Sequence, residues 1–166
     1  MGNIFTNESV SPADVVQLSN GSTSVFVILI LLSGSSLANS EWEIEFLIWF
    51  AQENDQSIHG IGMVGVDIAD IGWTHENFKK EKNFVLNVIE NIFNLNNLDV
   101  LDYEPQVKYI EDKIIEFREF VRVFTEDQIP KPSVRDFYKP INNNYNKCER
   151  HGIYLYSEGC YICNDR

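Results

Sequence analysis

The chain has 166 residues, of which 44% are hydrophobic and 13% aromatic, which is enough for one core with a small appendage and excludes a wholly disordered protein. The formal net charge is −12, and no lysine or arginine precedes Lys79, so residues 1–78 carry ten acidic residues and no basic one. This charge disfavours direct binding to nucleic acid or to anionic membranes and favours basic partners, although acidity also serves solubility alone.

An apolar segment, residues 25–32, is followed by small residues and therefore looks like part of a secretory signal. A secretory signal begins with positive charge, however, whereas the only charged residues in 1–24 are Glu8 and Asp14. Eight apolar residues are also too few to span a bilayer, which takes about 20 residues in a helix. We therefore expect a soluble, cytoplasmic protein.

The first predicted helix covers residues 12–19. Ser11 is suited to the N-cap and Pro12 to the first helical position, while Asn20 and Gly21 are suited to its end.

Residues 25–32 fit either a buried strand or a buried helix. Their β-branched residues favour a strand, but the run does not alternate, and only residues 61–68 elsewhere in the main body have any strand character. We predict a central helix over 23–37, with an α+β fold and a central strand at 25–32 as the alternative. Small residues at 33–36 would let another helix approach closely.

Three further helices are predicted. The first runs from Ser40 to about Asn54, with Ser40 and Glu43 forming a capping box. The second covers 75–95 after a cap at Thr74. Residues 106–125 form the third, because their apolar residues recur every three or four positions, which is the helical period.

All three cysteines lie in the last twenty residues, as Cys148-x2-His151-x8-Cys160-x2-Cys163. Three thiolates and one imidazole are a ligand set that tetrahedral Zn²⁺ prefers, and each two-residue spacing supplies a ligand pair from one turn. Four protein ligands leave no open position, so the predicted zinc site is structural and not catalytic. The alternatives are three buried or reactive cysteines, or one disulfide with a free thiol.

The predicted architecture is mainly α. It consists of a single helical domain over 1–125, an extended linker over 126–146, and a C-terminal zinc ribbon over 147–166. The linker is predicted from its prolines and its run of asparagines. The ribbon is predicted from the alternating residues 152–156 and from the turn that follows them.

Gly60, Gly62 and Gly65 match the spacing of a dinucleotide-binding loop, but a predicted helix precedes them where that loop needs a strand. We therefore interpret them as a glycine-rich turn. The acidic and histidine residues nearby, His59, Asp67, Asp70, His75 and Glu76, have no metal-ligand spacing. An enzyme that uses an Asp67/Asp70/His75 loop remains an alternative.

Tryptophans and a tyrosine of the body are expected to lie mostly in the core, with one or two as anchors for a partner. These residues are Trp42, Trp49, Trp73 and Tyr103.

The middle of the chain resembles small bacterial immunity proteins of polymorphic toxin systems, including contact-dependent inhibition. The resemblance covers some thirty residues: Trp42-Glu43, Trp49-Phe50-Ala51, Asp55-Gln56-Ser57, Gly62-x-Val64-Gly65-Val66-Asp67-Ile68-x-Asp70-Ile71 and Trp73. It implies a non-catalytic, cytoplasmic inhibitor that binds a cognate toxin domain, which is frequently a basic nuclease.

We therefore predict that the acidic first half binds a cationic protein partner. The alternatives are the enzyme described above and a zinc-bearing scaffold or regulatory module. The predicted partner-binding residues are Glu41, Glu45, Glu53, Asp55, Asp67 and Asp70.

Overall fold

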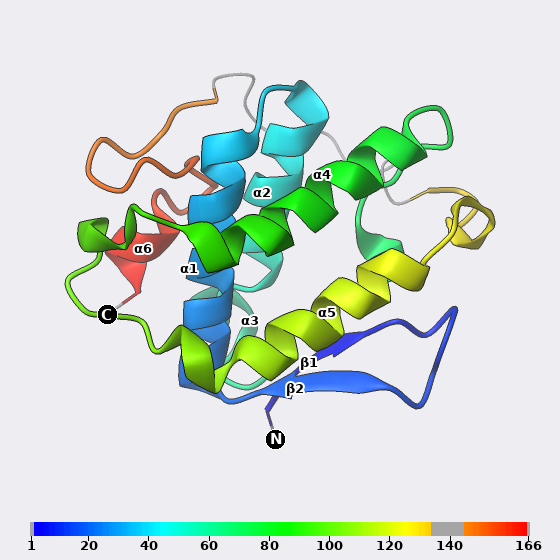
Figure 1. The fold of residues 1–166 in the computed structure, drawn as a ribbon, viewed down its shortest axis with the longest axis horizontal. Helices are drawn as coiled ribbons and strands as arrows, with labels where there is room; N and C mark the ends of the chain where they lie inside the picture. The colour runs from blue at the N-terminus through cyan, green and yellow to red at the C-terminus, as the bar shows by residue number, and fades with distance from the viewer. Residues whose placement is uncertain (1, 134–144, 166) are drawn as a thin grey trace.

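The computed structural model describes residues 2–133 and 145–165. It is mainly helical, as predicted, and its central element is α1 (Asn20–Leu37), which contacts α2 (Glu41–Glu53) and α4 (Phe78–Asn91) (Figure 1). A fourth long helix, α5 (Glu111–Val123), packs against α4 and against a hairpin of β1 (Asn3–Thr6) and β2 (Val15–Leu18). The remaining elements are short: α3 (Gln56–His59), α6 (Tyr161–Asn164) and the 3-10 turns Ile68–Asp70, Ile92–Asn94, Leu98–Val100, Val107–Tyr109 and Glu126–Gln128.

The apolar segment 25–32 is helical, so the predicted central helix is confirmed and the alternative strand is wrong. Its residues from Phe26 to Leu32 are at most 1% exposed, because α2, α4 and β2 surround α1. By length and composition α1 is also able to cross a membrane, but 61% of it is buried inside the protein, as in a core helix.

The small residues at the end of α1 allow close packing, as predicted. A side-chain carbon at Gly34 would lie 2.3 Å from Leu47 Cδ2 of α2, so only glycine fits without movement of this contact. The Ser33 hydroxyl donates a hydrogen bond to the Val88 carbonyl of α4 (2.5 Å).

The predicted helix 12–19 is wrong, because residues 15–18 form β2 and pair antiparallel with β1. The hairpin places Phe5 and Val16 opposite each other with both side chains buried. Alternate burial is the pattern of a strand with one face on a core, and it outweighs the local helix signals. Ser11 instead belongs to a turn in which its hydroxyl donates to Asp14 (2.6 Å).

The other predicted helices are confirmed with shifted ends. Ser40 caps α2 by accepting a hydrogen bond from the Glu43 amide (3.4 Å), while the Glu43 carboxylate accepts from Asn39 (2.7 Å) and not from Ser40. Helix α4 begins at Phe78, after a turn in which Thr74 accepts a hydrogen bond from the Asn77 amide (3.3 Å). Residues 107–109 form a 3-10 turn before α5.

The glycine-rich segment is a turn, as interpreted above, and it returns the chain alongside β1. Gly60, Gly62 and Gly65 have φ values of 104°, 77° and 136°, which side chains disfavour. At Gly65 a side-chain carbon would also lie 1.7 Å from the Ile4 carbonyl oxygen. This close approach lets the Ile4 amide donate to the Val64 carbonyl (3.0 Å).

Residues 134–144 of the predicted linker lie outside the described residues. Before this gap, the Ser133 hydroxyl donates to the carbonyl of the fully buried Trp73 (2.9 Å). After it, buried residues of the C-terminal segment join the same hydrophobic core as the helices: Ile153, Tyr156, Tyr161 and Ile162. The segment therefore packs on the helical body.

Candidate metal centre and acidic surface

Two tight turns build the C-terminal segment. In the first, the Cys148 amide donates to the Ile153 carbonyl and the Gly152 amide donates to the Cys148 carbonyl (both 2.8 Å). In the second, Tyr156 and Gly159 exchange both backbone hydrogen bonds (2.9 and 3.0 Å). The strand pairing in the described part of this segment is limited to single bridges, so the expected ribbon consists of two turns followed by α6, with Cys160 at its N-cap position.

These turns bring Cys148, His151, Cys160 and Cys163 together, with all four candidate ligand atoms within 4.8 Å of one another. His151 Nδ1 lies 3.6 Å from Cys148 Sγ and 3.4 Å from both Cys160 Sγ and Cys163 Sγ. Ideal metal–ligand lengths in a tetrahedral site put sulfur and nitrogen about 3.6 Å apart and two sulfurs about 3.8 Å apart. The cluster therefore has dimensions suited to one metal ion.

The same distances argue against a disulfide. Cys148 Sγ and Cys163 Sγ are 3.9 Å apart, whereas a disulfide bond is about 2.05 Å long, and all three cysteines are free. In the alternative of three buried or reactive cysteines, burial applies to Cys160 alone, because Cys148 is partly exposed and Cys163 is exposed.

Burial sets the protonation of two of the candidate ligands. Burial, followed by the charge of Arg150, lowers the pKa of His151, which keeps the imidazole neutral as a ligand must be. Burial raises the pKa of Cys160 to about 12. A buried thiolate at this position therefore needs a bound cation.

The segment that carries the candidate metal ligands lies beside the end of α1. The Lys147 ammonium donates to the Ser35 carbonyl (2.9 Å), and the Tyr154 amide donates to the Ser35 hydroxyl (3.2 Å). Helix α1 has no basic residue in its last turn, so Lys147 supplies the positive charge that a helix C-terminus favours.

Two tyrosines of the C-terminal segment form hydrogen bonds with acidic residues that we predicted for partner binding. Tyr145 donates to Glu45 (2.9 Å) and lies within hydrogen-bond distance of Glu41 (3.2 Å), while Tyr156 donates to Asp55. Glu45 is 1% exposed and Asp55 is 7% exposed, so neither carboxylate presents charge to a partner. This role of the tyrosines was not predicted, although hydroxyl donors in a tail that follows an acidic body are a signal for it.

The other three predicted partner-binding residues lie together. Glu53, Asp67 and Asp70 line a hollow of about 500 Å³, together with Glu8 and the half-buried ring of Trp49. Glu8 was not predicted, because it lies some forty-five residues before Glu53 in the sequence and reaches the hollow only through the hairpin. We call these five residues the acidic hollow.

The acidic hollow carries unneutralised charge. None of the ion pairs found within residues 2–133 and 145–165 involves Glu8, Glu53, Asp67 or Asp70. Burial and the neighbouring charges of Asp67, Glu53 and Glu8 raise the pKa of Asp70. Asp67 also has a structural role, because it accepts hydrogen bonds from the Thr6 hydroxyl (2.7 Å) and the Glu8 amide (2.9 Å).

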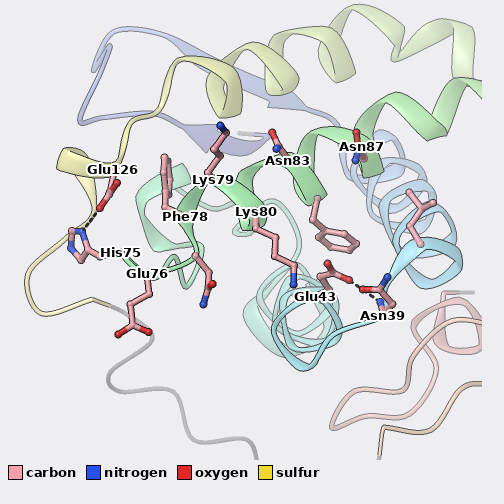
Figure 2. Close-up of a pocket in the computed structure, with 13 residues that line it drawn as sticks. Asn39, Glu43, His75, Glu76, Phe78, Lys79, Lys80, Asn83, Asn87 and Glu126 are labelled. Carbon is pink, nitrogen blue, oxygen red and sulfur yellow. Dashed lines mark hydrogen bonds and ion pairs between the residues drawn. The ribbon is translucent and has the colours of Figure 1, made fainter.

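A second hollow, of about 670 Å³, lies between the start of α4 and the start of α2 (Figure 2). Its lining mixes both charges, including Glu43, Lys79 and Lys80, and His75 contacts Glu126 there (3.4 Å). The residues of the predicted catalytic loop are divided between the two hollows, because His75 lines this one while Asp67 and Asp70 line the acidic one.

The predicted aromatic anchors have different positions. Trp73 is fully buried, and its indole donates to the Ile68 carbonyl (2.8 Å). Trp42 stacks on Trp73 with ring centroids 5.8 Å apart, whereas Tyr103 is 45% exposed on another surface. Trp49 alone among the four lines the acidic hollow.

No protein-family model matches the chain, and neither a curated protein nor a solved structure is significantly similar to it.

Proposed function

We propose that this protein is a non-catalytic, cytoplasmic binding protein of the immunity type, which neutralises a cationic toxin domain through the acidic hollow. The observation that carries the proposal is the hollow itself: four carboxylates surround an accessible tryptophan, and none has an ion-pair partner among the described residues. Such a site suits a lysine or arginine side chain, which binds both to carboxylates and to the face of an indole.

We further propose that the metal is zinc and that its role is structural. Zn²⁺ takes three thiolates and one imidazole in a tetrahedral shell, and Cys148, His151, Cys160 and Cys163 supply that set. Bound there, the ion would link the two turns of the C-terminal segment and so hold Lys147 and Tyr156 against α1 and the α2–α3 junction. A thiolate zinc site also suits a reducing compartment such as the cytoplasm.

The test of the binding function is association with the product of the neighbouring gene, which we expect to be a toxin domain. Charge reversal at Glu53 and Asp70, by the double variant Glu53→Lys/Asp70→Lys, should slow association about tenfold or more at low salt. The matched control is Asp99→Lys/Glu104→Lys, which changes the net charge equally at exposed positions outside the hollow. Stopped-flow or surface-based kinetics at two ionic strengths should show the effect in the hollow variant, and high salt should reduce it.

Equal association of both charge-reversed proteins with the toxin domain would contradict a role for the acidic hollow. The melting temperature of the hollow variant should remain close to that of the unmodified protein, because the two carboxylates form no hydrogen bond with the described residues that the reversal would break.

A further inference from the structure

Beside the acidic hollow, three exposed apolar side chains lie on one short segment. Ile58, Ile61 and Met63 are 46%, 76% and 67% exposed, and they fall within six residues of one another. Single exposed apolar residues are common on protein surfaces, but a contiguous group marks an interaction site. We call these three residues the apolar loop.

The apolar loop is held in one conformation. The Gly60 amide donates to the Gln56 carbonyl (3.0 Å), and the Met63 amide donates back to the Gly60 carbonyl (3.2 Å). The Gln56 side chain accepts from the Gly62 amide (3.4 Å), and the Asn3 side chain accepts from the Val64 amide (3.2 Å). Apolar side chains on a fixed loop bind with little loss of conformational entropy.

The apolar loop is connected to the acidic hollow at both of its ends. Val64, the residue after Met63, accepts a hydrogen bond from the Ile4 amide, and Ile4 is 40% exposed and lines the hollow. At the start of the loop, His59 Nε2 lies 3.0 Å from the carbonyl oxygen of Gln52, and Gln52 directly precedes Glu53 of the hollow.

We infer that the apolar loop is the hydrophobic anchor of the partner interface, and that it enters an apolar pocket on a protein whose surrounding surface is basic. This inference rests on the function proposed above and adds the residues that hold the complex together. Buried apolar anchors determine the lifetime of a complex, whereas rim charges mainly determine the rate of encounter.

The negative charge of the acidic hollow favours a cationic protein over other apolar surfaces that could cover the loop. A second copy of the chain would bring four more carboxylates against the same hollow, and an anionic membrane would bring charge of the same sign. Only a cationic surface combines an apolar contact with complementary charge.

The experiment uses the metal-loaded full-length chain and synthetic peptides in which Leu or Phe alternates with Lys or Arg. Matched peptides carry Glu in place of the basic residues, or Ser in place of the apolar ones. We expect the basic apolar peptides to shift the backbone amide signals of residues 58–65 and 67–70 in heteronuclear NMR spectra. Ile61→Ser/Met63→Ser should weaken their binding about tenfold or more.

The control variant is Ile115→Ser, which removes a 38% exposed isoleucine from α5 and should leave peptide binding unchanged. Thermal melting of both variants checks that the fold is retained.

The outcomes separate the two proposals. If charge reversal at Glu53 and Asp70 abolishes peptide binding but the serine variant binds normally, the anchor is overturned and the acidic site stands. If only the serine variant weakens peptide binding, the apolar anchor is supported and the proposed charge recognition is contradicted. Two results would contradict a cationic partner. One is binding of the Glu-containing peptides as tightly as the Lys- or Arg-containing ones. The other is self-association of the protein in sedimentation that the serine variant abolishes.

Discussion

The candidate metal ligands and the acidic partner-binding residues were both predicted from residue types, but only the metal ligands all come together in the fold. All four predicted metal ligands converge, because each pair is separated by two residues and one turn sets its distance. The six predicted acidic residues instead span thirty residues, and the fold buries Glu45 and Asp55 while it gathers three others in a hollow. Local spacing therefore predicts a site well, whereas a count of charges does not predict which of them remain exposed.

The two regions are also connected. The C-terminal segment that holds the metal ligands hydrogen-bonds to Asp55 and Glu45, so acidic residues in the first half of the chain are part of its docking surface. The comparison can be tested by removing, in turn, a metal ligand, a contact between the two regions and the carboxylates of the hollow.

The largest expected effect follows loss of a metal ligand. Cys163→Ser should lower the free energy of unfolding by several kcal/mol, because metal-binding free energy contributes directly to folding. Cys163 is exposed, so its replacement disturbs packing little and the loss reports the metal. Denaturant unfolding of the metal-loaded protein measures this change, with Ser157→Ala in the exposed turn as the control.

Chelation should destabilise the unmodified protein by a similar amount and have little further effect on Cys163→Ser. Metal analysis after purification without chelator should give one equivalent of zinc. Less than about half an equivalent would contradict the one-metal site.

Loss of the contact between the regions should have the next largest effect. Tyr156→Phe removes the donor to Asp55 and leaves a buried carboxylate with fewer hydrogen bonds, which should cost about 1–3 kcal/mol of unfolding free energy. Tyr154→Phe is the matched control, because the Tyr154 hydroxyl has no hydrogen bond to the described residues. Equal stability of the two variants would show that the Tyr156 contact contributes nothing.

This contact should also depend on pH. Burial alone would raise the pKa of Asp55, but hydrogen bonds from Ser57 and Tyr156 outweigh it and hold the pKa below its ordinary value. The ionised carboxylate is therefore favoured in the folded state, and its contribution is lost as the pH falls below about 4. The stability difference between Tyr156→Phe and the unmodified protein should shrink over that range, because protonation of Asp55 weakens its hydrogen bond with Tyr156. Release of the metal by acid affects both proteins and cancels in the difference.

Within the acidic hollow, Asp67→Asn should have a moderate effect. The substitution weakens charge-assisted hydrogen bonds from Thr6, Glu8 and Ala69, and we expect a loss of about 1–2 kcal/mol of unfolding free energy. Glu53→Gln removes the same charge without such a hydrogen bond and should leave stability nearly unchanged. If both variants behave alike in thermal unfolding, Asp67 acts only as a surface charge.

The smallest expected effect has the opposite sign. Because the pKa of Asp70 is raised in the folded state, ionisation of Asp70 lowers stability as the pH rises through that pKa. Asp70→Asn should therefore stabilise the protein at neutral pH, by less than about 1 kcal/mol because the site is partly solvated, and have no effect in strong acid. Differential scanning calorimetry at pH 3 and pH 7 checks this, with Asp99→Asn as the control.

The helices were the predictable part of the fold, and the hairpin was not. The regular period of α5 carries its own helical signal. The apolar run of α1 fits a strand or a helix, and it was predicted as a helix because little else in the main body could pair with a strand. Residues 15–18 form a strand only because β1, nine residues earlier, supplies the hydrogen-bonding partner. Local signals at Ser11 and Pro12 could not reveal that pairing.

The sequence by itself determined the candidate metal ligands, the period of α5 and the sign of the net charge. Each of these depends on residue type and on spacing within a few positions. Only the tertiary structure decided that Glu8 joins Glu53 in the acidic hollow, that Tyr156 covers Asp55, and that the apolar loop lies exposed beside them. These relations join residues far apart in the chain, and burial and distance between such residues exist only once the core has formed.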